Sequence, residues 1–115
     1  MTNNFPKYQR LCGQLHIAQL YKDGRKFVAW PLRVSFMPAD ETQVLVWAPK
    51  SLFKHATDRN RLRRQMREAW RLNKAQLQKP YKLAFNYIDK EQQPYAIIER
   101  AFVKAIRKLN EETDS

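Results

Sequence analysis

The segment TDRNRLRRQMREAWRLNK, residues 57–74, has the clearest periodicity in the chain. Its apolar residues recur at three- and four-residue spacing, which predicts a helix over residues 58–74, capped by Thr57 or Asp58. At about 100° per residue, one side gathers the apolar residues, which are Leu62, Met66, Ala69 and Trp70, with Leu72 at the border. Roughly opposite lie Asn60, Arg63, Arg64, Arg67 and Arg71. We therefore expect one side of this helix in a protein core and the other as a basic surface.

The basic residues of this helix have few acidic partners. Glu68 is the internal acid against seven basic residues, which are Arg59, Arg61, Arg63, Arg64, Arg67, Arg71 and Lys74. Like charges four residues apart repel, so the pattern is unfavourable for helix stability. Arginine binds phosphate through two parallel hydrogen bonds, and its predominance over lysine favours contact with nucleic acid over a solvated surface. Three residues before the helix could extend this surface, namely Lys50, Lys54 and His55.

The segments on the N-terminal side of this helix predict one more helix and two strands. A helix is expected over residues 9–22, ended by Gly24 in a left-handed conformation. Residues 27–37 and 43–48 are rich in β-formers and predict strands that pair as an antiparallel hairpin. Pro31 indicates an edge position or a bulge in the first of them.

The segments on the C-terminal side predict a strand and a last helix. Residues 81–88 alternate so that Leu83, Phe85 and Tyr87 share one face. Pro94 suits the first turn of a helix with apolar positions Ile97, Ile98, Ala101, Phe102, Ala105, Ile106 and Leu109. The order of elements predicts an α+β sandwich, with helices packed on one sheet, as a single domain over residues 1–115. Residues 1–8 are expected to form a loose arm and residues 111–115 a frayed tail.

The composition indicates a polyanionic partner. The chain of 115 residues has 22 Lys+Arg against 11 Asp+Glu, a net charge of +11. Such an imbalance costs stability through self-repulsion, which a nucleic acid would relieve.

The composition also indicates the cellular compartment and makes a catalytic cysteine an unfavoured hypothesis. Cys12 is the single cysteine, so no disulfide can form within the chain, and its pairing with His16 one helical turn on is common by chance. The sequence has no apolar run long enough for a membrane span and no signal-peptide pattern at its start. We therefore expect a cytoplasmic protein.

Residues 59–71, RNRLRRQMREAWR, resemble the signature helix of the bacterial ribonuclease P protein. That family carries an Arg-Asn-Arg core, an apolar residue, two basic residues, two further residues and then Arg-Glu-Ala-aromatic-Arg, and the match here is ungapped. The flanks resemble the family as well, at Arg10-Leu11, at Tyr21-Lys22-Asp23-Gly24 and at Pro49-Lys50 with Phe53-Lys54-His55-Ala56. The resemblance covers roughly residues 10–109.

The resemblance implies a fold, a partner and an activity. The fold would be a two-layer α+β sandwich with a mixed sheet and a left-handed crossover between parallel strands. The partners would be the catalytic RNA of ribonuclease P and precursor tRNA, and the activity removal of the 5′ leader from that tRNA. The RNA and its Mg²⁺ ions would do the chemistry, so no protein side chain would be catalytic, and the protein alone would be monomeric. The catalytic RNA would contact the face that holds Arg59, Asn60, Arg61, Arg63, Arg64 and Arg67.

The resemblance further implies a cleft for the single-stranded leader between the first helix and the sheet. Of the two aromatic residues that the family commonly has on the first helix, Tyr21 matches the second, whereas Ile17 takes the place of the first. Phe36 and Trp47 on the sheet could stack a base instead. A second departure is Lys54, which replaces the family's usual glycine before the signature helix.

Three other functions compete with a ribonucleoprotein subunit. A structural RNA-binding protein of the ribosomal type would share the composition and the basic helix, but the signature helix favours the subunit. An autonomous nuclease would need clustered carboxylates or a positioned histidine, whereas the acids at residues 40–41 and 89–91 lie in expected turns. A membrane-surface role fits the basic amphipathic helix less well, because its apolar side is better explained as core.

Overall fold

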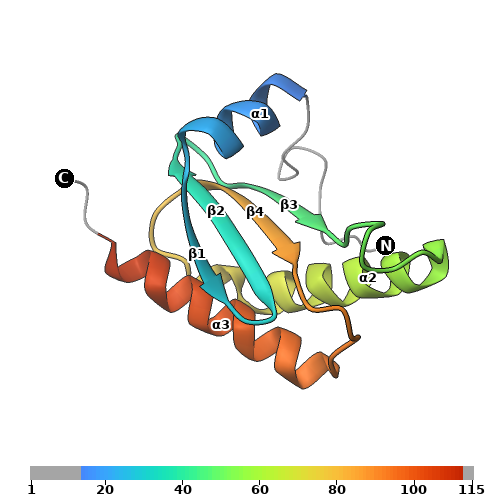
Figure 1. The fold of residues 1–115 in the computed structure, drawn as a ribbon. Coiled ribbons are helices and arrows are strands. Elements are labelled where there is room, and N and C mark those ends of the chain that lie inside the picture. The colour runs from blue at the N-terminus through green and yellow to red at the C-terminus, as the bar shows by residue number, and fades with distance from the viewer. Residues whose placement is uncertain (1–13, 113–115) are drawn as a thin grey trace, which may run out of the picture.

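The computed structural model describes residues 14–112, with side chains from residue 17 onward. Figure 1 shows the fold, and the chain order is α1 (Gln14–Asp23), β1 (Arg25–Ala29), β2 (Leu32–Pro38), β3 (Gln43–Trp47), α2 (Ala56–Asn73), a 3₁₀ turn η2 (Lys74–Gln76), β4 (Tyr81–Tyr87) and α3 (Tyr95–Glu111). This order confirms the predicted α+β class. The predicted loose arm and the last three residues of the predicted tail lie outside the described residues. The tail begins later than predicted, since α3 continues to Glu111 and Glu112 forms an ion pair with Arg25 at 2.6 Å.

The four strands form one mixed sheet in the order β1-β2-β4-β3. β1 and β2 pair antiparallel, β2 and β4 pair antiparallel, and β3 and β4 pair parallel, so α2 is the crossover between the two parallel strands. The prediction of a single strand over residues 27–37 was wrong, because the chain reverses at Trp30 and Pro31 to form the β1–β2 hairpin. The predicted hairpin between residues 27–37 and 43–48 was also wrong. The chain after β3 returns through α2, which inserts β4 between β2 and β3.

The main core lies between the sheet and the pair α2 and α3 (Figure 1). The α2 residues predicted for the core are all buried and Asn73 joins them, whereas Leu72 is 51% exposed. Aromatic rings connect the layers, since the Trp70 ring lies 5.9 Å from that of Phe85, which lies 4.3 Å from Phe102 of α3. The predicted face of β4 is confirmed, because Leu83, Phe85 and Tyr87 are all buried in this core.

The opposite face of the sheet carries α1 (Figure 1), so the helices cover both faces rather than one. Leu20 is fully buried against Ala84, and Ile17, Met37 and Leu45 pack around them in a second, smaller apolar cluster. This second cover explains why every residue from Leu83 to Tyr87 is buried, although the side chains of a strand alternate between faces.

Gly24, between α1 and β1, is required for a different reason from the one predicted. No positive φ is recorded for it, so it is not in the left-handed conformation. A Cβ atom at this position would lie 2.3 Å from the carbonyl oxygen of Leu20 and 3.0 Å from that of Phe36. The glycine therefore permits the close approach of α1 to the sheet.

Candidate nucleic-acid interface

Helix α2 turns its apolar side toward the sheet and presents its basic residues around the rest of its circumference. Its first helical residue is Ala56, and neither Thr57 nor Asp58 caps it as predicted, since His55 occupies the N-cap position without a side-chain hydrogen bond. At its other end, the Asn73 side chain donates to the Ala69 carbonyl at 2.8 Å. The arginines of this helix are not equivalent, because their environments divide them into several groups.

Arg59 supports the loop before α2. Its Nη1 atom donates to the carbonyl oxygens of Phe53 at 2.8 Å and of Lys54 at 2.9 Å. Phe53 is itself buried against Tyr87, with 5.7 Å between ring centroids. Although the sequence grouped Arg59 with the RNA-binding residues, its guanidinium is committed to two backbone carbonyls.

Arg61 and Arg64 are exposed, and neither forms a hydrogen bond or an ion pair with another residue of the described chain. Arg61 lies beside the loop that precedes α3, where it lines a shallow depression with Gln93 and Pro94. Arg67 is exposed as well. Because these three side chains are already exposed to solvent, their guanidinium groups can bind phosphate without a change in the fold.

Arg63 lies on the side of α2 that is next to the edge strand β3. Its guanidinium carbon lies 5.6 Å from the centroid of the Trp47 ring, and its Nη2 atom donates to the side chain of Asn60. Arg63 is therefore held against the sheet by an aromatic residue that is distant in sequence.

Arg71 is compensated by Glu68. The guanidinium donates to the two carboxylate oxygens at 3.0 and 2.5 Å, and both side chains are partly exposed. This hydrogen bonding lowers the pKa of Glu68 and raises the pKa of Arg71 above its usual value. The charge of Arg71, one of the predicted RNA-binding arginines, is thus balanced by an ion pair with Glu68.

Three basic residues predicted to extend the α2 surface lie in the segment before this helix. Lys50, Lys54 and His55 are all exposed in the segment that connects β3 to α2. They lie at the N-terminal end of α2, where Asp58 is the acidic residue in the first turn.

The predicted leader-binding residues on α1 lie over the sheet. The Tyr21 hydroxyl and the Asn86 side-chain amide form a hydrogen bond at 3.2 Å, which ties the end of α1 to β4. Ile17 is partly buried in the small apolar cluster with Leu20. It therefore packs on the sheet but presents no aromatic ring.

The assignment of Phe36 to the leader site was wrong. Phe36 is 3% exposed and lies in the main core, with ring centroids 5.6 Å from Phe27 and 5.8 Å from Tyr81. Alternation along β2 turns it toward α2 and α3, whereas α1 packs on the other face. A base cannot reach it.

The other sheet candidate, Trp47, is 46% exposed on the α1 side of the sheet. Arg33 and Asn86, which were not among the predicted site residues, lie beside it in the same cross-strand row. The exposure of Trp47 could be predicted from the sequence, because side chains alternate along β3. Val44 and Val46 point into the core, so Trp47 points to the other face.

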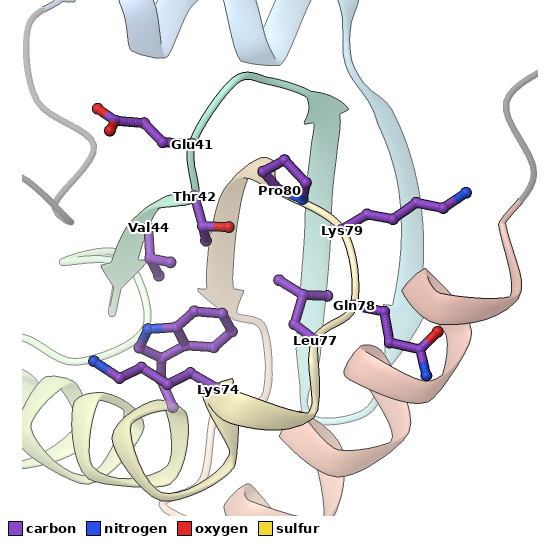
Figure 2. Close-up of a pocket in the computed structure, with 9 residues that line it drawn as sticks. Glu41, Thr42, Val44, Lys74, Leu77, Gln78, Lys79 and Pro80 are labelled. Atoms are coloured by element: carbon purple, nitrogen blue, oxygen red, sulfur yellow. The ribbon is translucent and has the colours of Figure 1, made fainter.

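A cavity of about 310 Å³ opens at the C-terminal end of α2 (Figure 2), and none of its lining residues is a predicted site residue. Val44, Leu77 and Pro80 give it apolar walls, and Glu41 is the one carboxylate in its lining. Within residues 14–112, no group of three or more His, Cys, Asp or Glu residues could hold a metal ion, and no helix has the length and apolarity of a membrane span.

Comparison with known proteins gives one consistent family. The Ribonuclease P family model matches residues 5–110. The chain is 32% identical over 120 residues to the ribonuclease P protein component of Porphyromonas gingivalis strain W83, covering 94% of this chain and 88% of the relative. The structure of the RNase P protein from Thermotoga maritima superposes with a TM-score of 0.76 at 20% identity, covering 86% of this chain and 96% of that one. The structure of the RNase P protein from Staphylococcus aureus superposes with a TM-score of 0.75 at 16% identity, covering 90% of this chain and 95% of that one.

Proposed function

The chain belongs to the ribonuclease P protein family, and from this premise we propose that it binds the catalytic RNA and the 5′ leader of precursor tRNA. In doing so it aids endonucleolytic removal of the leader, which gives the mature 5′ end of the tRNA. The observation that carries the proposal is the surface of α2, where exposed arginines surround a helix whose opposite side is buried in the core.

The physical role is replacement of counterions. The catalytic RNA and precursor tRNA are both polyanions, so their association costs electrostatic free energy and requires Mg²⁺ or salt. A protein with a net charge of +11 at their junction lowers that cost. The protein then acts by bringing two RNAs together rather than by supplying a reacting group.

The two RNA partners contact different surfaces in this proposal. Arg61, Arg64 and Arg67 of α2, with the exposed segment before it, contact the catalytic RNA. The leader lies on the α1 side of the sheet, next to Tyr21. Support for this division comes from the two separate apolar clusters, which place α1 and α2 on opposite faces of the sheet.

The chemistry belongs to the RNA in this proposal, with Mg²⁺ ions bound mainly by RNA phosphates. The protein alone is monomeric and acts in the cytoplasm, where its RNA partners are found. It contributes no catalytic side chain.

The experiment that tests the function is cleavage of precursor tRNA by a bacterial ribonuclease P RNA at low Mg²⁺, with the protein present, absent or alone. We expect cleavage at the mature 5′ end only when RNA and protein are combined. Failure of the protein to stimulate cleavage, together with tight and salt-sensitive binding to unrelated structured RNA, would favour the alternative of a ribosomal-type structural RNA-binding protein. Cleavage by the protein alone would refute both.

Paired variants test the α2 surface. The double variant Arg61→Gln with Arg64→Gln removes two exposed guanidinium groups, and Arg100→Gln with Arg107→Gln removes two exposed guanidinium groups from α3. Each lost phosphate contact should reduce the slope of log affinity against log salt by about 0.7 to 0.9. We expect this reduction for the α2 pair and not for the α3 pair; equal effects would contradict the assignment of the α2 surface.

A further inference from the structure

The cavity at the C-terminal end of α2 lies between the loop that enters β3 and the segment that connects α2 to β4 (Figure 2). Val44 lines it from β3, and Leu77 and Pro80 line it from the connecting segment. Its volume of about 310 Å³ lies within the range of about 300 to 1,000 Å³ that is typical of small-molecule sites. Such sites combine apolar walls with a few polar groups that orient the ligand. The cavity is therefore large enough for a small organic molecule.

Trp70 supplies an unpaired hydrogen-bond donor to this cavity. The residue is 2% exposed and lines the cavity from α2. Its Nε1 atom is buried and has no hydrogen-bond partner within residues 14–112. A buried tryptophan N–H usually has a partner, because an unpaired buried donor has lost its hydrogen bonds to water without replacement. An acceptor atom within the cavity would supply the missing partner.

The charged groups around the cavity lie at its rim. Figure 2 shows the Thr42 hydroxyl turned toward the space between the two segments. The charged ends of Glu41, Lys74 and Lys79 point outward in the same view, and Lys79 Nζ donates to the backbone carbonyl of Glu112 at 3.3 Å. The interior thus offers apolar walls, a hydroxyl and the indole N–H. A charged ligand would lose its hydration there, so an uncharged ligand is favoured.

We propose that this cavity binds an uncharged, largely apolar small molecule whose carbonyl oxygen accepts a hydrogen bond from Trp70 Nε1. The apolar body of the ligand contacts Val44, Leu77 and Pro80. A carbonyl group suits the site because it accepts a hydrogen bond and needs no acceptor in return. None of the residues proposed to contact RNA lines the cavity, so this inference does not rest on the proposed function.

The test uses acetophenone, an uncharged aromatic ketone, as the probe and the full-length chain labelled with ¹⁵N. The chain has three tryptophans, each with an indole N–H resonance. Trp30→Phe and Trp47→Phe, at two exposed positions, assign two of these resonances and leave the third to Trp70. We expect acetophenone to shift the Trp70 resonance in a saturable manner and to leave the other two in place. Absence of a saturable shift at Trp70, or similar shifts of all three resonances, would overturn the proposal.

Two variants with the same substitution test whether the probe occupies the cavity. Leu77→Phe places a larger side chain in the cavity wall, whereas Leu72→Phe makes the change on the surface of α2, where Leu72 is 51% exposed. We expect Leu77→Phe to weaken binding by more than about 10-fold, because the probe and the new ring compete for one volume, and Leu72→Phe to change it by less than about 2-fold. Equal affinities in the two variants would contradict binding in this cavity.

A further variant and a charged probe test the hydrogen bond and the ligand class. Trp70→Phe removes the N–H group and should weaken acetophenone binding by about 5- to 100-fold, followed through the backbone amide resonance of Val44. Benzoate has nearly the shape of acetophenone but carries a charge, so it should bind the unmodified protein more weakly. Unchanged affinity in Trp70→Phe, or tighter binding of benzoate, would refute the proposed ligand class. If Trp70→Phe does not fold, the comparison of Leu77→Phe with Leu72→Phe decides.

Discussion

Replacing Arg59 by alanine should destabilise the protein, whereas the same change at Arg64 should not. Arg59 donates two hydrogen bonds to the carbonyl oxygens of Phe53 and Lys54, at 2.8 and 2.9 Å. A hydrogen bond with a charged partner contributes about 1.5 to 3 kcal/mol. The Lys54 residue is exposed and its carbonyl can regain water, so we expect a combined loss of about 2 kcal/mol.

The expected loss converts to a shift in melting temperature. An unfolding entropy of about 2.1 cal/mol/K per residue gives about 0.24 kcal/mol/K for a chain of 115 residues. Arg59→Ala should therefore lower the melting temperature by about 8 °C. Arg64 is exposed and has no hydrogen bond or ion pair with another described residue, so Arg64→Ala should stay within about 0.5 kcal/mol, or roughly 2 °C.

Thermal unfolding followed by circular dichroism measures both variants. Arg59→Lys serves as an intermediate case, because an ammonium group keeps the charge but lacks the planar guanidinium geometry. Equal melting temperatures for Arg59→Ala and Arg64→Ala would refute the argument that Arg59 supports the loop before α2. In RNA binding at a temperature where both are folded, Arg64→Ala should show the reduced salt slope expected of a lost phosphate contact.

Trp70→Ala should cost about 3 to 5 kcal/mol in urea unfolding, because the ring is buried against Phe85, and a loss below about 1 kcal/mol would contradict its place in the core. Gly24→Ala should lower stability by about 1 to 3 kcal/mol, measured in the same way, because its Cβ would lie 2.3 Å from a carbonyl oxygen; a neutral result would mean that α1 shifts freely on the sheet. Tyr95→Phe should raise stability at neutral pH by about 1 kcal/mol, because the buried Tyr95 hydroxyl has no hydrogen-bond partner within residues 14–112. Burial, followed by nearby carboxylates, raises the pKa of Tyr95, so the folded state favours the protonated hydroxyl. The free energy of unfolding therefore falls as pH rises above about 10, where the tyrosine of the unfolded chain ionises. The variant should therefore lose less stability than the parent between neutral and strongly alkaline pH, and an identical pH dependence would argue against a raised pKa.

Several features followed from local sequence pattern. The four apolar residues of α2 selected from helical periodicity are all buried, and six of the seven selected for α3 are buried as well. The alternation of β4 placed its core face correctly. These predictions worked because a helix or strand fixes the direction of each side chain relative to its neighbours in sequence, and burial of one face then follows. The family was likewise accessible from the motif on α2, which is a contiguous stretch of residues.

Other features depended on contacts between distant residues. β2 and β3 are consecutive in the chain, yet β4 separates them in the sheet, and this placement follows from the packing of α2 across one face. The same layering decided the exposure of the two aromatic candidates on the sheet, since Phe36 points into the core under α2 and α3, whereas Trp47 lies on the α1 face and stays 46% exposed.

The arginines of α2 show most directly what tertiary structure adds. The sequence pattern predicts one basic surface for them. In the fold, however, Arg59 holds the loop before α2, Arg71 pairs with Glu68, and Arg63 lies over the indole of Trp47 on β3. The sequence by itself determined that this helix is basic and which of its sides is buried, because charge and periodicity are local properties. Only the tertiary structure decided which guanidinium groups remain available to RNA, because a partner for a long side chain can come from any segment that folding brings within its reach.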